Sequence, residues 1–317
     1  MNLYDLTGHR PDHRCFIPSD RLVLPTCRVG VEIELENFHC VPKLSLYWLV
    51  TEDGSLRDGG QEMLFADPLF GQDVINALEE VEEYCRGLDP QPVASKRTSV
   101  HVHLDVRDMT GEQLVNLLLL YFVFEKPLLH YHKNIRDNNI FCLPYHKAES
   151  VVENLAEVIY FIRKGKKTEV RNALGNIGKY SALNIGAVRS KGSVEFRHMG
   201  GTYDSEAILE WINIILSLKA AALALKEDPV AITESMSVQG PPGFLYSVFG
   251  GDLGEKLLYD DITNDMFSGV RLGQDALYVD SLWDSHDSFT TKGELSELLL
   301  SKAKDKELAI KLAKENF

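Results

Sequence analysis

The stretch that decides the fold is residues 28–36, which are Arg-Val-Gly-Val-Glu-Ile-Glu-Leu-Glu. Apolar and polar residues alternate there with a period of two, which is typical of a β-strand with one face buried against a core. Between the apolar positions stand Glu32, Glu34 and Glu36. We therefore expect a strand whose second face carries a row of carboxylates.

Two other stretches repeat this pattern with different charged residues. One carries His101 and His103 between apolar residues, and the other carries Glu195 and Arg197. A charged sheet face is costly to bury unless it is solvated or binds a charged ligand. Carboxylates together with imidazole suit divalent cations that are shared with phosphates. The three strands together predict a sheet face that binds metal ions and an anion.

Each motif has a simpler interpretation when it is taken alone. Alternating glutamates are typical of a solvated sheet face. A His-x-His pair occurs in ordinary strands as well as in cupin-like metal sites. A Glu-x-Arg pair is usually an exposed ion pair that contributes little to stability. The combination is more specific than any member, because the same polar pattern recurs on three separate strands.

The rest of the chain predicts strands separated by helices. A strand at 47–50 precedes a turn at Asp53-Gly54-Ser55, and Thr110 and Gln113 form a capping box. The predicted elements are helices at 73–86, 110–125 (ending before Pro127), 148–163, 204–226 and 292–317, a hairpin of 179–188 with 193–198, and loops at 239–251. Clear alternation in the strands favours an α+β fold with an antiparallel sheet.

Composition narrows the class of protein. The formal net charge is −14, which disfavours general binding to nucleic acid or anionic membranes. The N-terminus lacks the regions of a signal peptide, and the apolar run Leu114–Phe124 is too short to span a bilayer and predicts a buried helix. The five cysteines form no CxxC pair, which favours reduced thiols and a cytoplasmic protein. We expect an irregular leader (1–27), a core (28–225) and a helical and loop extension (226–317).

A set of short motifs in this order resembles the amidoligase family, within the glutamine synthetase and glutamate–cysteine ligase superfamily of carboxylate–amine ligases. The resemblance covers about residues 28–225 and implies a glutamine-synthetase-like antiparallel sheet with helices on one face. Residues 226–317 are not explained by it. The motifs are Val29–Glu34, Asp53-Gly54-Ser55 followed by Glu62, His101-Val102-His103, Tyr180–Asn184, Val194–Arg197 and Gly201-Thr202.

The resemblance implies roles for individual residues. The metal ligands for Mg²⁺ (or Mn²⁺) would be Glu32, Glu34, Glu62, His101 and Glu195. The residues near the nucleotide ATP would be Asn184, His101 and Arg197, and those with catalytic roles would be Arg197, Glu62 and His103. Arg197 would stabilise the transferring phosphoryl group.

The reaction that the resemblance implies is ligation of a carboxylate to an amine. ATP would convert a small-molecule or peptide carboxylate to an acyl phosphate, and an amine donor would then displace phosphate. The sequence does not identify which site carboxylate takes the proton from the amine. The basic run from Lys164 to Arg171 is either a solvated helix end or a loop that closes on ATP or an acidic substrate.

Other interpretations remain at this point. Another reaction of the same superfamily, such as glutamate–cysteine ligation or guanidino phosphorylation, would use the same motifs. A cupin-like oxygenase or isomerase would need His-x-His and Glu on a barrel, and a catalytically inactive scaffold would keep only the fold. His130, His132 and His146 form either a second metal cluster or, as we favour, a loop without metal.

Overall fold

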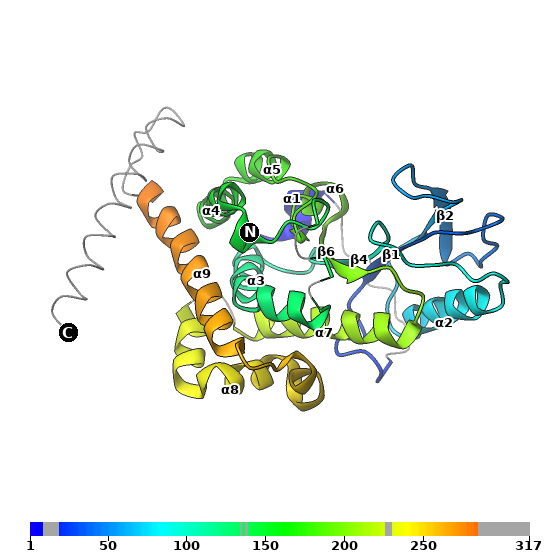
Figure 1. Ribbon diagram of the computed structural model, residues 1–317. Helices are drawn as coiled ribbons and strands as arrows, with labels where there is room; N and C mark the ends of the chain where they lie inside the picture. Colours follow the sequence, from blue (N-terminus) through cyan, green and yellow to red (C-terminus); the bar gives the residue numbers. More distant parts are fainter. Residues whose placement is uncertain (9–18, 134, 137–138, 226–229, 285–317) are drawn as a thin grey trace.

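The computed structural model of the 317-residue chain describes residues 1–8, 19–133, 135–136, 139–225 and 230–284. Figure 1 shows one sheet with helices beside it and against it. Along the chain the elements are α1 (Leu3–Thr7), β1 (Val29–Leu35), β2 (Trp48–Glu52), β3 (Gln61–Phe65), α2 (Gln72–Arg86), β4 (Ser99–Asp105), α3 (Gly111–Tyr131), the 3₁₀ helix η1 (Tyr145–Lys147), α4 (Glu149–Arg163), α5 (Lys167–Gly175), β5 (Leu183–Asn184), α6 (Ala187–Lys191), β6 (Ser193–Gly200), α7 (Ser205–Ala224), α8 (Val230–Leu257) and α9 (Ile262–Asp284).

The strands form one antiparallel sheet in the order β2-β3-β1-β4-β6-β5. The strand predicted around residues 28–36 is therefore near the middle of the sheet, with β3 on one side and β4 on the other. The predicted α+β class with an antiparallel sheet is confirmed. In the described part of the chain the sheet ends at β2 and β5 and does not close, so the cupin-like barrel alternative does not fit this architecture.

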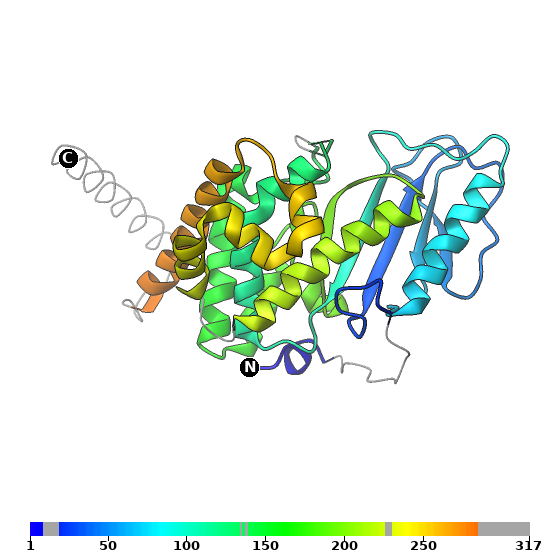
Figure 2. The same cartoon turned by 90° about the horizontal axis from the view of Figure 1, so that it is seen from below.

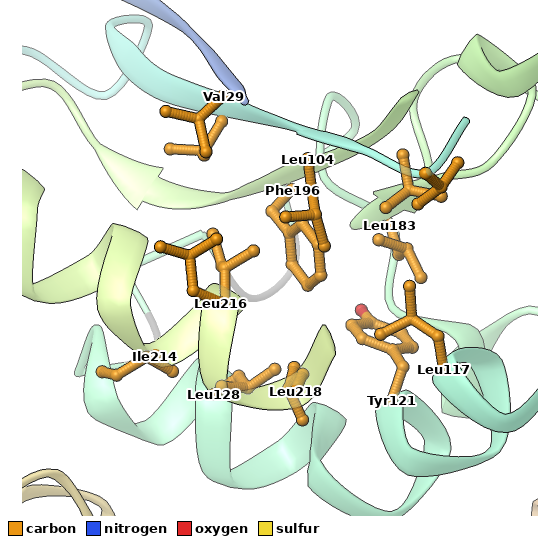
Figure 3. Close-up of a cluster of buried hydrophobic side chains, with 14 of the residues drawn as sticks. Val29, Leu104, Leu117, Tyr121, Leu128, Leu183, Phe196, Ile214, Leu216 and Leu218 are labelled. Atoms are coloured by element: carbon orange, nitrogen blue, oxygen red, sulfur yellow. The ribbon is translucent and has the colours of Figure 1, made fainter. Parts of the chain in front are cut away.

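The apolar face of the sheet packs on helices. Helices α2 and α7 run along this face (Figure 2), and α7 contacts both α2 and β4. In the core, Leu104 and Phe196 point from the sheet toward Leu216 of α7 and Leu117 of α3 (Figure 3). Burial of these side chains is the main driving force that holds the helices against the sheet. It leaves the opposite sheet face to the polar residues.

Helix α3 is longer than its sequence predicts. The capping box of Thr110 and Gln113 is confirmed at its start, but the helix continues through Pro127 to Tyr131. Proline inside a helix removes one backbone hydrogen bond and is normally a breaker. Here Leu128 and Leu129, which follow it, are fully buried, and this burial outweighs the lost bond.

The predicted hairpin of 179–188 with 193–198 is wrong in its first half. Only Leu183 and Asn184 pair with β6, and the short helix α6 stands where a tight turn is expected. Alternating apolar residues before position 188 pack into the core without forming a longer ladder. Gly192, with a φ of 72°, ends α6 in the left-handed region that glycine adopts readily.

The segment after residue 229 is more helical than its proline and glycine content predicts. Residues 239–251, expected as loops, lie within α8, where Gly240 and Gly250 leave helical geometry and kink the chain. Helix α9 then packs on α3 and α4. The charged helix predicted at 292–317 lies outside the described residues.

Two described helices, α3 and α7, are long and apolar enough to cross a membrane by length and composition alone. Most of each apolar window is buried inside the protein, 83% for α3 and 61% for α7. Both helices contribute buried side chains to the core. The buried helix predicted at 114–124 is confirmed by the burial of its side chains.

Candidate active site and metal centre

The polar face of the sheet is assembled by the register of its central strands. Glu32 of β1 lies opposite His101 of β4, and His103 lies opposite Glu195 of β6. The same register brings together residues that are more than 160 positions apart in the chain. A bulge opposite His101 keeps this arrangement while the strand pairing shifts.

A first acidic group centres on Glu32. Its two carboxylate oxygens lie 3.1 Å from Nδ1 of His101 and 3.1 Å from Nε2 of His103. Nδ1 of His101 is also 3.6 Å from Oε1 of Glu195. One ligand atom each of Glu32, His101 and Glu195 lies within 4.8 Å of the others. These three residues can share one metal ion.

A second acidic group lies on the β3 side of Glu32. Glu34 is paired across the strands with Glu62, and their carboxylates meet that of Asp53 in the turn after β2, again within 4.8 Å. The Glu34 carboxylate accepts a hydrogen bond from Ser99 Oγ, and Thr51 donates to Glu62 over 3.1 Å. Three carboxylates in this space suit a hard cation such as Mg²⁺.

The electrostatics of the two groups differ. Burial, reinforced by the charges of Glu32, Glu34 and Asp53, raises the pKa of the Glu62 carboxyl. For Glu32, burial alone would raise the pKa, but hydrogen bonds from His101 and His103 outweigh it and hold the pKa well below the usual range. Crowded carboxylates of this kind repel one another, and a bound cation relieves that repulsion.

Arg197 and Asn184 both contact Glu195 rather than open solvent. Arg197 forms an ion pair with Glu195 through Nη1, and its Nε donates to the Phe141 carbonyl over 3.1 Å. Asn184 donates to the other Glu195 oxygen over 2.8 Å. The Asn184 Oδ1 is buried without a hydrogen-bond partner. Glu195 is thus held in place by two residues predicted for the site.

A second guanidinium, that of Arg136, lies behind Glu34. It is only 3% exposed, and its Nη1 donates to the Thr98 carbonyl over 3.2 Å while Nε has no hydrogen-bond partner. Burial lowers the pKa of Arg136, and the nearby Glu34 and Cys142 oppose this effect. A buried cation beside the second acidic group can help to hold an anion there.

A cleft opens onto this site from the β5 edge. It has a volume of about 640 Å³, and Glu32, Glu195 and Arg197 line it together with residues of α5 and α6. Lys191 stands at its edge, with Nζ 3.2 Å from Oε1 of Glu32. A smaller and mostly apolar pocket of about 260 Å³ meets the same Glu32 and Lys191 from the other side.

The donor set fits the divalent cations that the sequence predicts. The ligand atoms are mostly carboxylate oxygens, which Mg²⁺ prefers, and His101 adds a nitrogen that Mn²⁺ accepts equally well. Two groups on neighbouring strands can hold two ions. The buried, unpartnered Asn184 Oδ1 and Arg136 Nε are polar atoms that a bound ligand can satisfy.

All the predicted site residues lie on this face, together with several neighbours for which the sequence predicts no role. Asp53 belongs to a turn and to one of the family motifs, but it is not among the predicted metal ligands, although a carboxylate after a strand is a usable signal. Lys191, at the end of α6, and Ser99, at the start of β4, lie outside the charged alternating positions that the sequence indicates. Arg136 follows α3 in a stretch without alternation, and no sequence pattern indicates it.

The remaining histidines do not form a second cluster in the part of the chain that the structure describes. His130 stacks on Tyr259, and His132 packs against Trp211. His146 instead contacts the buried Glu125 at 2.7 Å. Of the basic run, only Arg171 lines the cleft beside the acidic groups.

The comparison with known proteins points to one family. Residues 64–219 match the model of a family described as "putative amidoligase enzyme". This segment contains His101, His103, Asn184, Glu195 and Arg197, and thus much of the site. A comparison with curated proteins found no match. The family match supports a ligase-type enzyme.

Proposed function

We propose that this chain is an ATP- and Mg²⁺-dependent ligase that joins a carboxylate to an amine, and the match of residues 64–219 to the amidoligase family supports the proposal. The observation that carries the proposal is the pair of acidic groups on one sheet face, centred on Glu32 and Glu34. Two metal positions side by side suit the phosphates of a nucleotide. We also propose that the sheet is of the glutamine synthetase type.

The reaction would proceed through an acyl phosphate. A carboxylate oxygen attacks the γ-phosphorus of ATP, and the bond from that phosphorus to the β–γ bridging oxygen breaks, releasing ADP. The amine nitrogen then attacks the carbonyl carbon, and the C–O bond to phosphate breaks as the amine loses a proton. Free carboxylates need this activation because their own oxygen is a poor leaving group.

The metal ions, when bound, would neutralise the phosphate charges and orient the γ-phosphate. Glu32, His101 and Glu195 would hold one ion, and Glu34, Glu62 and Asp53 the other. The two groups share β1, which supplies Glu32 to one and Glu34 to the other. His103, 3.1 Å from Glu32, would orient that carboxylate.

Arg197 would stabilise the phosphoryl group during transfer. Its guanidinium lies in the cleft wall beside Glu195, where the planar fork can donate two hydrogen bonds to phosphate oxygens. Asn184, whose Oδ1 is unpartnered, would contact nucleotide or substrate from the same wall. The base for the amine would be a site carboxylate, and Glu62, which is only partly buried, is the candidate.

Location and partners are part of the same proposal. The substrates would be a small-molecule or peptide carboxylate and an amine donor, in the cytoplasm, without general nucleic-acid or membrane binding. The net charge of −14 supports the last point because it opposes association with polyanions.

The proposal can be tested by trapping the acyl phosphate with hydroxylamine. The full chain is incubated with Mg·ATP, hydroxylamine and separate carboxylates, including L-glutamate, L-aspartate, glutarate and butyrate, and both ADP and hydroxamate are measured. We expect them to form in equal amounts with at least one carboxylate. ADP formed with creatine or arginine in place of a carboxylate would indicate guanidino phosphorylation and contradict the ligase.

A further inference from the structure

Three exposed cations gather on one wall of the cleft. Arg171 lies on α5, Lys179 on the connection after it, and Arg189 on α6. Within the described part of the chain none of the three forms an ion pair with a carboxylate, whereas the neighbouring Lys191 pairs with Glu32. Unpaired cations facing one cleft produce a local positive potential in a chain that is acidic overall.

The Arg189 guanidinium lies over the C-terminal end of α5. A Cβ added to Gly175, the last residue of α5, would lie 2.4 Å from Nη1 of Arg189. Glycine at this position therefore leaves room for the guanidinium. The negative end of the helix dipole also favours a cation there.

The cations lie on the opposite side of the site from the second acidic group. Asp53 and Glu62 belong to the β2–β3 side of the sheet, whereas Arg171 and Arg189 stand beyond β6, next to β5. Ions at the two acidic groups would hold the nucleotide phosphates over β1 and its neighbours β3 and β4. In phosphoryl transfer the attacking and leaving oxygens are roughly in line. With ADP on the Asp53 side, the carboxylate approaches from the opposite side, which is the cationic cleft.

We propose that the carboxylate substrate carries a second anionic group, which Arg171, Lys179 and Arg189 bind, so that the enzyme acts on a dicarboxylate or an acidic peptide. This inference rests on the proposed function and adds the substrate class to it. A second carboxylate would be repelled on the Asp53 side, where three carboxylates already meet. The cationic wall attracts it and turns the reacting carboxylate toward the γ-phosphate.

Binding measurements with the full chain test the proposal. The protein is saturated with Mg²⁺ and the non-hydrolysable analogue AMPPNP, and glutarate, tri-L-glutamate and butyrate are titrated by calorimetry. We expect glutarate or tri-L-glutamate to bind at least about tenfold more tightly than butyrate, as expected for added charge-assisted hydrogen bonds. The two acidic probes distinguish a small dicarboxylate from a peptide.

Substitutions in the cleft test which residues bind the acidic probe. Arg171→Ala and Arg189→Ala should each weaken the acidic probe about tenfold or more and change the Kd of Mg·AMPPNP less than about twofold. Gly175→Ala places a methyl group 2.4 Å from the present position of Arg189 Nη1, so the side chain must shift but keeps its charge, and the same probe should weaken less than in Arg189→Ala. The exposed Lys43, far from the cleft in the β1–β2 connection, supplies the control for net charge, because Lys43→Ala should change neither affinity.

Two results would overturn the proposal. One is equal binding of butyrate and both acidic probes, including no binding of any. The other is a loss of Mg·AMPPNP affinity in the cleft variants, which would assign the cations to the nucleotide. Failure of the wild-type chain to bind Mg·AMPPNP would instead contradict the proposed function itself.

Discussion

At the scale of single residues, the candidate site depends on carboxylates that have few other roles. Glu34 is 6% exposed and accepts a hydrogen bond from Ser99, while facing Glu62 and Asp53. Such crowding opposes folding unless a cation is present. This unfavourable repulsion is consistent with carboxylates that serve ligand binding and do not stabilise the fold.

The first prediction concerns Glu34. Glu34→Gln removes one negative charge and keeps an acceptor for Ser99, so we expect the free energy of unfolding without metal to change by less than about 1 kcal/mol. The affinity for Mg·AMPPNP should fall at least about tenfold. Chemical denaturation and calorimetry measure the two effects. Unchanged nucleotide affinity would remove Glu34 from the metal site.

The second prediction concerns Arg197, which already pairs with Glu195. Arg197→Lys keeps a positive charge but loses the planar fork that suits a phosphoryl group. We expect the variant to fold and bind Mg·ATP, with ADP release slowed by about a hundredfold, as for loss of one transition-state donor. A lower melting temperature with unchanged ADP release would show that the ion pair has only a structural role.

The sequence predicted these residues because strand periodicity decides which side chains share a face. Glu32, His101 and Glu195 converge since each occupies the polar side of a half-buried strand. Arg136 could not be predicted, because it lies in an irregular segment and reaches the site through tertiary contacts such as that with the Thr98 carbonyl. The periodicity of a strand indicates which side chains share a sheet face, but it carries no information on the loops that border that face.

At the scale of elements, a buried carboxylate joins α3 to the 3₁₀ helix η1. Glu125 is 1% exposed and accepts hydrogen bonds from the Tyr121 hydroxyl at 3.0 Å and from the backbone N–H groups of Tyr145 and His146 at 2.6 and 2.9 Å. Tyr121 is in turn 3.0 Å from His198 on β6. The network links the helical layer to a strand of the site.

The third prediction uses this network. Glu125→Ala leaves several buried donors without an acceptor, so the free energy of unfolding should fall by about 3 kcal/mol. Glu125→Gln retains one acceptor oxygen and should lower the free energy of unfolding less than Glu125→Ala does. Denaturant titration of both variants measures the difference. Equal, small losses of unfolding free energy in the two variants would show that the neighbouring donors do not need Glu125 as their hydrogen-bond acceptor.

Element boundaries depended on tertiary contacts that the sequence does not display. The alternation before Val188 predicted a long strand, but burial of those apolar residues is achieved by a two-residue strand and a helix turn. Pro127 predicted a helix end that buried leucines override. Where alternation or capping was unambiguous, as in β1 and at Thr110, the prediction and the structure agree.

At the scale of the whole molecule, the sheet separates two functions. One face packs on helices and supplies stability (Figures 1 and 2). The other carries the carboxylates, imidazoles and guanidinium of the site. A site on a central sheet is held by strands that do not need to move when ligand binds. The fold class could be predicted from the alternation of apolar and polar residues in the strands. The packing of α8 and α9 on α3 could not be predicted from it.

The central claim is that metal ions bridge a nucleotide to this face, and thermal unfolding tests it most directly. The melting temperature of the full chain is measured with ATP alone, with ATP and Mg²⁺ or Mn²⁺, and with ATP in excess EDTA. A ligand that binds only the folded state at about a hundred times its Kd stabilises that state by about 2.7 kcal/mol. We predict this stabilisation only when the divalent cation is present. Equal stabilisation by ATP in excess EDTA would contradict the account.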